Sequence, residues 1–169
     1  MLKILFLDID GVLNNENSGT MWLCGPEHYG IDPNNVSILK KIITATDCKI
    51  VWITSWRKHP DDFVWNFNKY VRFTNPFPAI REELKEYTYT KSPLAPHRDK
   101  GDKSDDISLW TRENRSDIVK LGCRFAILDD QGDENLDFYT DSFFRTSTKT
   151  GLTDEIANRV IAHLNWKEK

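Results

Sequence analysis

The stretch LFLDIDGVLN, residues 5–14, places two aspartates one residue apart at the end of an apolar run and follows them with Gly11. Carboxylates this close repel each other, and when unpaired they raise each other's pKa. A divalent cation between them removes the repulsion and keeps both groups ionised. Asp8 and Asp10 therefore indicate a metal site at the point where a strand ends.

Three short apolar runs, each ended by polar residues, predict strands that are buried on both faces of a parallel sheet. The runs are LKILFL at 2–7, KIVWI at 49–53 and RFAIL at 124–128. Between the first two, DPNNVSILKKIITATD at 32–47 predicts a helix, because its Asp-Pro start suits a helix N-terminus and its apolar residues keep helical spacing. Strand, helix and strand in this order make a βαβ unit.

Other periodic segments predict further helices. Phe63, Phe67, Tyr70 and Val71 recur at helical spacing, which predicts an amphipathic helix that opens near Pro60. The remaining helical segments are AIREELKEY at 79–87, SDDISLWTRENRSDIVKL at 104–121 and TDEIANRVIAHL at 153–164. The alternation of strands and helices predicts a doubly wound, Rossmann-like α/β domain, a three-layer sandwich around a mostly parallel sheet.

Polar side chains follow each of the three predicted strands, namely Asp8 and Asp10, then Thr54 and Ser55, then Asp129 and Asp130. The carboxyl ends of parallel strands share one edge of a sheet, so four carboxylates and two hydroxyls should converge there. Oxygen ligands of this kind favour Mg²⁺, which usually shares its coordination shell with a substrate phosphate. This combination suits phosphoryl transfer, in which charge spread over three oxygens must be held from several sides.

Plainer interpretations compete for each of these residues taken alone. Asp129 and Asp130 could be turn residues or helix caps, and Thr54 and Ser55 could cap the following helix. Arg57 could bind a substrate phosphate or pair with a carboxylate. The tryptophans could stack on a nucleic-acid base, although core packing is the more ordinary role.

Four segments together resemble the haloacid dehalogenase (HAD) superfamily of phosphohydrolases. They are DIDGVLN at 8–14, VWITSW at 51–56, a lysine ahead of a helix, and AILDD at 126–130. All four motifs occur in order. The pieces VWITSWR, ILDD and TGLTDEIANRVIAHL are further similar to a small branch of that superfamily found in phage and bacterial proteins, including RNA-repair fusions.

The resemblance implies a role for each matched residue. Asp8 would attack phosphorus and become an aspartyl phosphate, while Asp10 would protonate the leaving oxygen and then activate water. Thr54 would hydrogen-bond the transferring phosphoryl group. Asp130, supported by Asp129, would hold Mg²⁺ together with the Asp8 carboxylate and the Asp10 backbone carbonyl.

The lysine of the third motif has two candidates in RDKGDKSDDI, Lys100 and Lys103. Lys103 is favoured because it directly precedes the helix predicted from 104 and can be aimed at the carboxylates. Either lysine taken singly could be an ordinary solvated surface charge. Gly11, Ser55 and Arg57 are further candidates for binding the substrate.

Members of the superfamily usually choose substrates with cap insertions after the first motif or between the second and third. The first interval, 14–34, has the size of a flap, and the second, 57–100, the size of a small insertion. The resemblance thus implies one HAD-like hydrolase domain over 1–169 with minimal or no cap, open to a nucleotide or a nucleic-acid terminal phosphate. Small phosphate esters, or a non-catalytic phosphate-binding or partner-binding module, are the alternatives.

Composition sets weaker limits. A chain of 169 residues with 39% apolar and 29% charged residues can form one globular domain rather than a disordered segment. A formal charge of −3 gives no global basic field that would attract nucleic acid unspecifically. The first apolar run is too short for a signal peptide or membrane span, and the three separated cysteines suit reduced thiols. We expect a cytoplasmic protein with no membrane partner; its oligomeric state is not predicted.

Overall fold

The structure is a computed structural model that describes residues 1–18, 30–58, 63–66, 71–74, 77–96, 102–131 and 136–166. It describes the backbone alone for residues 57, 58, 63–66, 71–74, 137 and 138. Much of the predicted flap, residues 19–29, and the end of the predicted insertion, residues 97–100, therefore lie outside the described residues.

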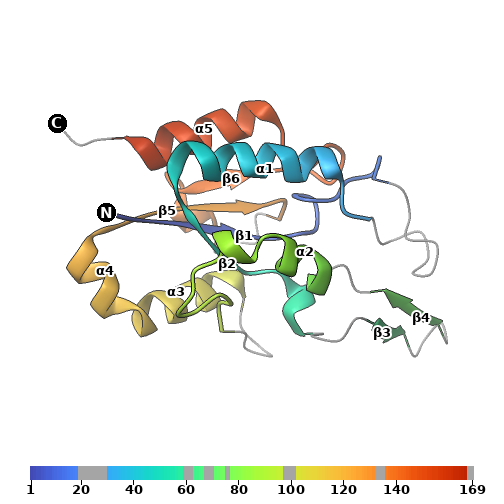
Figure 1. The fold of residues 1–169 in the computed structure, drawn as a ribbon, viewed down its shortest axis with the longest axis horizontal. Helices are drawn as coiled ribbons and strands as arrows, with labels where there is room; N and C mark the ends of the chain where they lie inside the picture. The colour runs from blue at the N-terminus through green and yellow to red at the C-terminus, as the bar shows by residue number, and fades with distance from the viewer. Residues whose placement is uncertain are drawn as a thin grey trace.

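A four-stranded parallel sheet forms the centre of the fold, in the order β2-β1-β5-β6 (Figure 1). Its strands are β1 (Leu2–Leu7), β2 (Lys49–Trp52), β5 (Cys123–Asp129) and β6 (Phe143–Arg145). The three apolar runs in the sequence correspond to the first three of these strands. The fourth strand, β6, follows the short helical turn η3 (Leu136–Tyr139) and was not predicted.

Helices cover both faces of this sheet, which makes the three layers visible in Figure 1. One layer holds α1 (Pro33–Thr46) and α5 (Asp154–Asn165), and the other holds α3 (Lys103–Glu113) and α4 (Arg115–Leu121). The predicted doubly wound α/β architecture is thus confirmed. None of the helices in the described ranges is long and apolar enough to cross a membrane.

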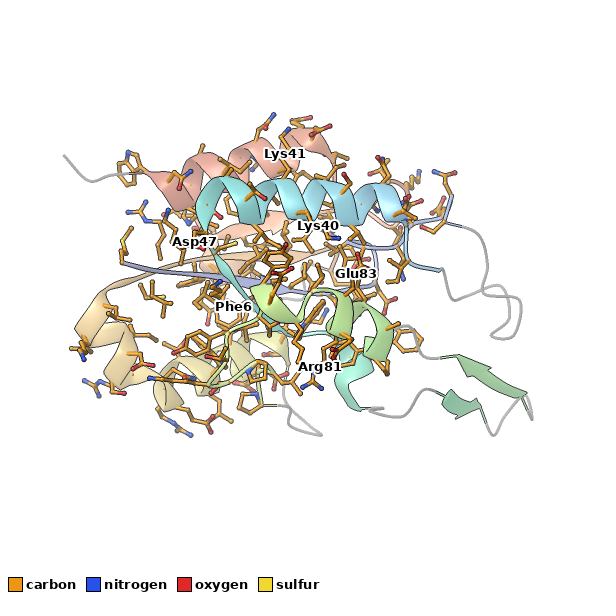
Figure 2. All side chains as sticks on the ribbon, viewed as in Figure 1. Phe6, Lys40, Lys41, Asp47, Arg81 and Glu83 are labelled. Atoms are coloured by element: carbon orange, nitrogen blue, oxygen red, sulfur yellow. The ribbon has the colours of Figure 1, made fainter. Side chains whose placement is uncertain are left out.

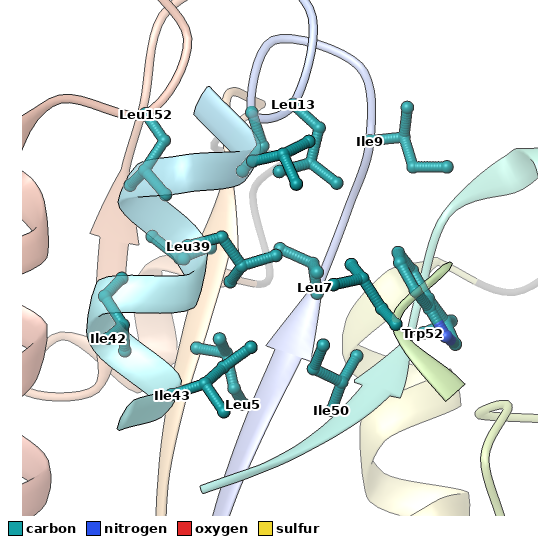
Figure 3. Packing of buried hydrophobic residues seen from close by; sticks show 14 of the residues in the cluster. Leu5, Leu7, Ile9, Leu13, Leu39, Ile42, Ile43, Ile50, Trp52 and Leu152 are labelled. Carbon is teal, nitrogen blue, oxygen red and sulfur yellow. The ribbon is translucent and has the colours of Figure 1, made fainter. Parts of the chain in front are cut away.

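The central strand β1 explains why its sequence is apolar without alternation. Successive side chains of a strand point to opposite faces, and both faces of β1 are covered. Leu5 and Leu7 pack toward α1, with Leu39 of that helix against them (Figure 3). Phe6 points the other way and meets Trp110 of α3 edge to face, with ring centroids 5.3 Å apart. Apolar side chains therefore cover both faces of this strand.

Short elements fill the interval between β2 and α3. They are the helical turn η1 (Ser55–Lys58), the strands β3 (Phe63–Asn66) and β4 (Val71–Thr74), helix α2 (Phe77–Glu83) and the turn η2 (Lys85–Tyr87). An ion pair of 2.8 Å joins Lys40 of α1 to Glu83 of α2 (Figure 2). Both side chains are largely exposed, so this pair contributes little to stability.

The prediction of a helix that begins near Pro60 is wrong. β3 and β4 form an antiparallel ribbon in which Phe63 lies opposite Thr74 and Asn66 opposite Val71. The segment is rich in aromatic and β-branched residues, which favour an extended backbone, and this preference outweighs a match of four positions to helical spacing. Pro60 and residues 67–70 lie outside the described residues.

Two other predicted helices are divided. The segment 104–121 bends at Asn114, which is buried and donates its side-chain amide to the carbonyl of Trp110 at 2.9 Å, so α3 ends and α4 begins there. A side chain that bonds the backbone in this way competes with the helical ladder. The segment 79–87 likewise divides into the end of α2 and the separate turn η2.

Candidate active site

Three carboxylates lie together at the carboxyl edge of the sheet. Asp8 directly follows β1, Asp129 ends the neighbouring strand β5, and Asp130 follows it. One oxygen of each lies within 4.8 Å of the others, and among the described residues these three form the group that could hold a metal ion. Asp8 is 3% exposed and Asp129 is fully buried. We call these three residues the acidic cluster.

Lys103 supplies the positive charge next to the acidic cluster. It is the first residue of α3, and its ammonium donates to Asp8 Oδ2 at 2.5 Å and to Asp129 Oδ2 at 2.6 Å. Asp102 caps the helix by accepting the backbone N–H of Asp105 at 2.9 Å, which fixes the turn that carries the lysine. The other candidate, Lys100, lies outside the described residues.

Among the residues that the structure describes, the charges in this group do not balance, because one ammonium faces three carboxylates. Burial, followed by the charge of Asp8, raises the pKa of both Asp129 and Asp130. Burial by itself would lower the pKa of Lys103, but the charges of Asp8 and Asp129 raise it, so the lysine stays protonated. An additional cation would relieve this excess of negative charge.

The donor set fits a magnesium ion. Asp130 Oδ1 is buried and has no hydrogen-bond partner among the described residues, which is the state expected of a ligand atom reserved for a cation. Gly11 permits this placement: its φ is +63°, and a Cβ there would lie 2.4 Å from the Cβ and Cγ of Asp130. The ligands are all carboxylate oxygens, the type that Mg²⁺ prefers.

Asp10 lies beside the acidic cluster, but its carboxylate is held by neutral donors instead. Asn14 Nδ2 donates to Oδ1 at 2.9 Å, and the indole N–H of Trp56 donates to Oδ2 at 2.8 Å. Burial, followed by the nearby charge of Asp8, raises the pKa of Asp10, although both hydrogen bonds oppose this shift. The predicted metal contact through its backbone carbonyl stays a prediction.

The residues after β2 reach the same edge of the sheet. The backbone N–H of Ile53 still pairs with Leu7, so Thr54 follows directly beside the strand that carries Asp8. Thr54 is fully buried, and its hydroxyl accepts the backbone N–H of Trp56 at 3.3 Å. Thr54 therefore does cap the following helical turn, which is the plainer role that the sequence also allowed. Ser55 is exposed, and the side chain of Arg57 lies outside the described structure. Their contacts with a substrate stay predictions.

Two residues of this site were missed in the sequence. Asn14 lies within the first motif but has no predicted role there, and for Trp56, as for the other tryptophans, the sequence predicts core packing or base stacking. Trp56 is in the core, at 6% exposure, but its indole N–H reaches Asp10, 46 positions earlier in the chain. The spacing of Asn14, four residues after Asp10 in a tight turn, is the one local signal that could have indicated its contact.

The fold, together with a carboxylate-bearing strand edge and a lysine at the start of a helix, defines a HAD-type, phosphatase-like module. Residues 4–157 match the family described as the HAD domain in Swiss Army Knife RNA repair proteins, and the chain belongs to this family. The resemblance seen in the four motifs is therefore confirmed. Comparisons with curated proteins and with solved structures give no match.

Proposed function

We propose that the protein is a Mg²⁺-dependent phosphohydrolase that forms an aspartyl phosphate and removes the terminal phosphate of a nucleic acid or nucleotide. The observation that carries the proposal is the acidic cluster, with Lys103 bonded to two of its members and a buried oxygen of Asp130 left without a partner among the described residues. Membership of the HAD family supports the same class of reaction.

Asp8 is the proposed nucleophile. Its Oδ1 accepts the backbone N–H of Ile9 at 2.8 Å and its Oδ2 accepts Lys103, so the carboxylate is fixed in one orientation. One of its oxygens forms a bond to phosphorus as the bond from phosphorus to the leaving oxygen breaks. Asp10 gives its proton to that leaving oxygen.

The second half of the reaction regenerates Asp8. Asp10, now ionised, takes a proton from water as the water oxygen attacks phosphorus and the acyl phosphate bond breaks, which releases inorganic phosphate. Lys103 and the hydroxyl of Thr54 hold negative charge on the transferring group. Asp8 and Asp130, supported by Asp129, would hold Mg²⁺, which would supply further charge stabilisation for the phosphoryl oxygens.

The substrate class rests on the family. The description of the family names RNA repair proteins. A phosphate at the end of a nucleic-acid strand is a phosphate ester, which suits the proposed reaction. Between β2 and α3, the described residues form the β3–β4 ribbon, α2 and two helical turns. On the strength of the family description, we take a nucleic-acid end as the leading substrate. We also propose a cytoplasmic location for the protein.

A substrate panel tests the proposal. Phosphate release would be measured with Mg²⁺ from 3′-phosphorylated and 5′-phosphorylated oligonucleotides, mononucleotides and sugar phosphates, with Asp8→Asn as the control. We expect turnover of at least one oligonucleotide class, loss of activity in Asp8→Asn, and no turnover in EDTA. Turnover of sugar phosphates alone would overturn the substrate class. If the wild type releases no phosphate from any substrate, the proposal of an enzyme is wrong, and the alternative of a non-catalytic phosphate-binding or partner-binding module is favoured.

A further inference from the structure

The carboxylate of Asp10 has both oxygens bonded to side chains of the protein. Asn14 Nδ2 lies 2.9 Å from Oδ1, and Trp56 Nε1 lies 2.8 Å from Oδ2. Both nitrogen atoms are donors only, so neither can take a proton from Asp10. They therefore fix the plane of the carboxyl group and leave its proton for another acceptor.

The two donors are themselves held in place. Asn14 is 1% exposed, and its Oδ1 accepts the backbone N–H of Gly11 at 2.8 Å. This contact fixes the orientation of the amide, because the opposite orientation would set two donors against each other. Trp56 is 6% exposed and packs in the hydrophobic core. A rigid donor on each oxygen leaves Asp10 little freedom to rotate.

Asp10 itself is only partly buried, while both donors are in the interior. Both donors come from buried residues, and each carboxyl oxygen keeps a lone pair that these two hydrogen bonds do not use. We propose that Asn14 and Trp56 are positioning residues that hold Asp10 in the orientation for protonating the leaving oxygen. This inference rests on the proposed function, since it assigns their role in that reaction.

Leaving-group dependence separates positioning from a merely structural role. Protonation matters greatly when an alkyl alcohol leaves and little when p-nitrophenolate leaves, because the latter is already a stable anion. General acid catalysis contributes about 10²- to 10⁴-fold to such steps. The ratio kcat/KM reports the first half-reaction for both substrates, so the later role of Asp10 toward water does not enter the comparison.

The test variant is Trp56→Phe, which keeps an aromatic ring and removes the N–H donor. The matched control is Trp110→Phe, since Trp110 is also buried and its indole N–H donates to the carbonyl of Ser92 at 2.9 Å, away from Asp10. For Trp56→Phe we expect kcat/KM to fall about 10-fold or more on an alkyl phosphate and less than about 3-fold on p-nitrophenyl phosphate. Trp110→Phe should leave the ratio of the two values unchanged.

Two further measurements complete the test. In an Asp10→Asn background, Trp56→Phe should cause no additional loss on the alkyl phosphate, because no acid is left to position. In nuclear magnetic resonance spectra, Asp10→Ala should shift the indole N–H signal of Trp56 and leave that of Trp110 in place. If Trp56→Phe lowers kcat/KM equally on both substrates, or if the Trp56 signal does not move, the inference is wrong. The proposed phosphatase function would not be affected by either result. A wild type without phosphatase activity would instead overturn the proposed function, and the inference with it.

Discussion

Gly11 is the residue whose replacement tests the packing of the acidic cluster most simply. A side chain there would need a left-handed backbone and would overlap Asp130. The left-handed conformation alone costs about 1–2 kcal/mol, and overpacking adds typically about 1–3 kcal/mol. We expect Gly11→Ala to lower the free energy of unfolding by more than about 2 kcal/mol and to weaken Mg²⁺ binding, measured by urea unfolding and calorimetry.

Gly122 provides the control for that substitution. Its φ is +65°, close to that of Gly11, but the nearest atom to an added Cβ is Met1 Cγ at 3.9 Å. The ψ of Gly122 is +148°, a backbone conformation almost confined to glycine, so Gly122→Ala should carry a backbone cost of about 1–3 kcal/mol with unchanged Mg²⁺ affinity. Equal effects of the two substitutions on unfolding and on metal binding would show that Gly11 is not specifically packed against Asp130.

The buried carboxylates also predict how stability depends on pH. In metal-free protein, burial and the charge of Asp8 raise the pKa of Asp129 from 3.8 to about 7. The folded state then binds more protons than the unfolded state, so stability falls as pH rises between these values. Between about pH 4 and pH 7 in EDTA, we expect the wild type to lose about 2–4 kcal/mol more stability than Asp129→Asn. Parallel urea-unfolding profiles of the two proteins would contradict this.

At the scale of elements, α3 matters because its first residue is Lys103. Asp102 caps this helix through Asp105 N and also accepts the hydroxyl of Ser104 at 2.8 Å. Loss of such a cap costs about 0.5–2 kcal/mol. We expect Asp102→Ala to lower kcat by more than about 10-fold, because a frayed first turn no longer holds Lys103 between Asp8 and Asp129.

The N-terminal cap of α5 provides the control, because its loss should lower stability without moving Lys103. Thr153 accepts the backbone N–H of Ile156 at 3.4 Å at the start of a helix whose own residues contribute nothing to the acidic cluster. Thr153→Ala should cost a similar amount of stability in thermal unfolding with kcat unchanged. If both cap variants lose activity in proportion to stability, the position of Lys103 is not what the Asp102 cap provides.

The elements that could be predicted are those whose burial is continuous along the chain. The run LKILFL matches β1 at both ends, since a strand covered on two faces is a nearly continuous apolar run, here interrupted by Lys3 alone. β6 spans three residues, Phe143–Arg145, which is too short for any period to show. The helix expected over Phe63, Phe67, Tyr70 and Val71 is wrong for the described strands β3 and β4, because a match of four positions to helical spacing is too short to decide between the two periods.

At the scale of the whole molecule, the strand order brings the first and third apolar runs side by side. β1 and β5 pair from Leu2 with Cys123 to Leu7 with Leu128, so Asp8 and Asp129 lie at the ends of adjacent strands although they are 121 positions apart in the chain. This convergence followed from the rule that parallel strands share one carboxyl edge. The contact of Trp56 with Asp10 could not be predicted, because it depends on the path of the chain after β2.

The same convergence predicts that metal and fold are coupled. A cation that binds the folded acidic cluster and not the unfolded chain stabilises the protein, by about 2.7 kcal/mol at one hundred times its dissociation constant. We expect Mg²⁺ to raise the midpoint of thermal unfolding in the wild type and to have little effect in Asp130→Asn. A shift of equal size in both proteins would place the bound ion elsewhere.

Covalent trapping at Asp8 tests the central claim most directly. The Asp10→Asn variant retains the nucleophile but lacks the group that activates water, so the phosphoryl-enzyme should accumulate with an aryl phosphate whose leaving group needs no proton. Acid quenching, proteolysis and mass spectrometry should find a single phosphoryl group on the peptide that contains Asp8, and none in the Asp8→Asn, Asp10→Asn double variant. Phosphate release by the wild type, with no phosphoryl group found on Asp8 in the single variant, would contradict the account.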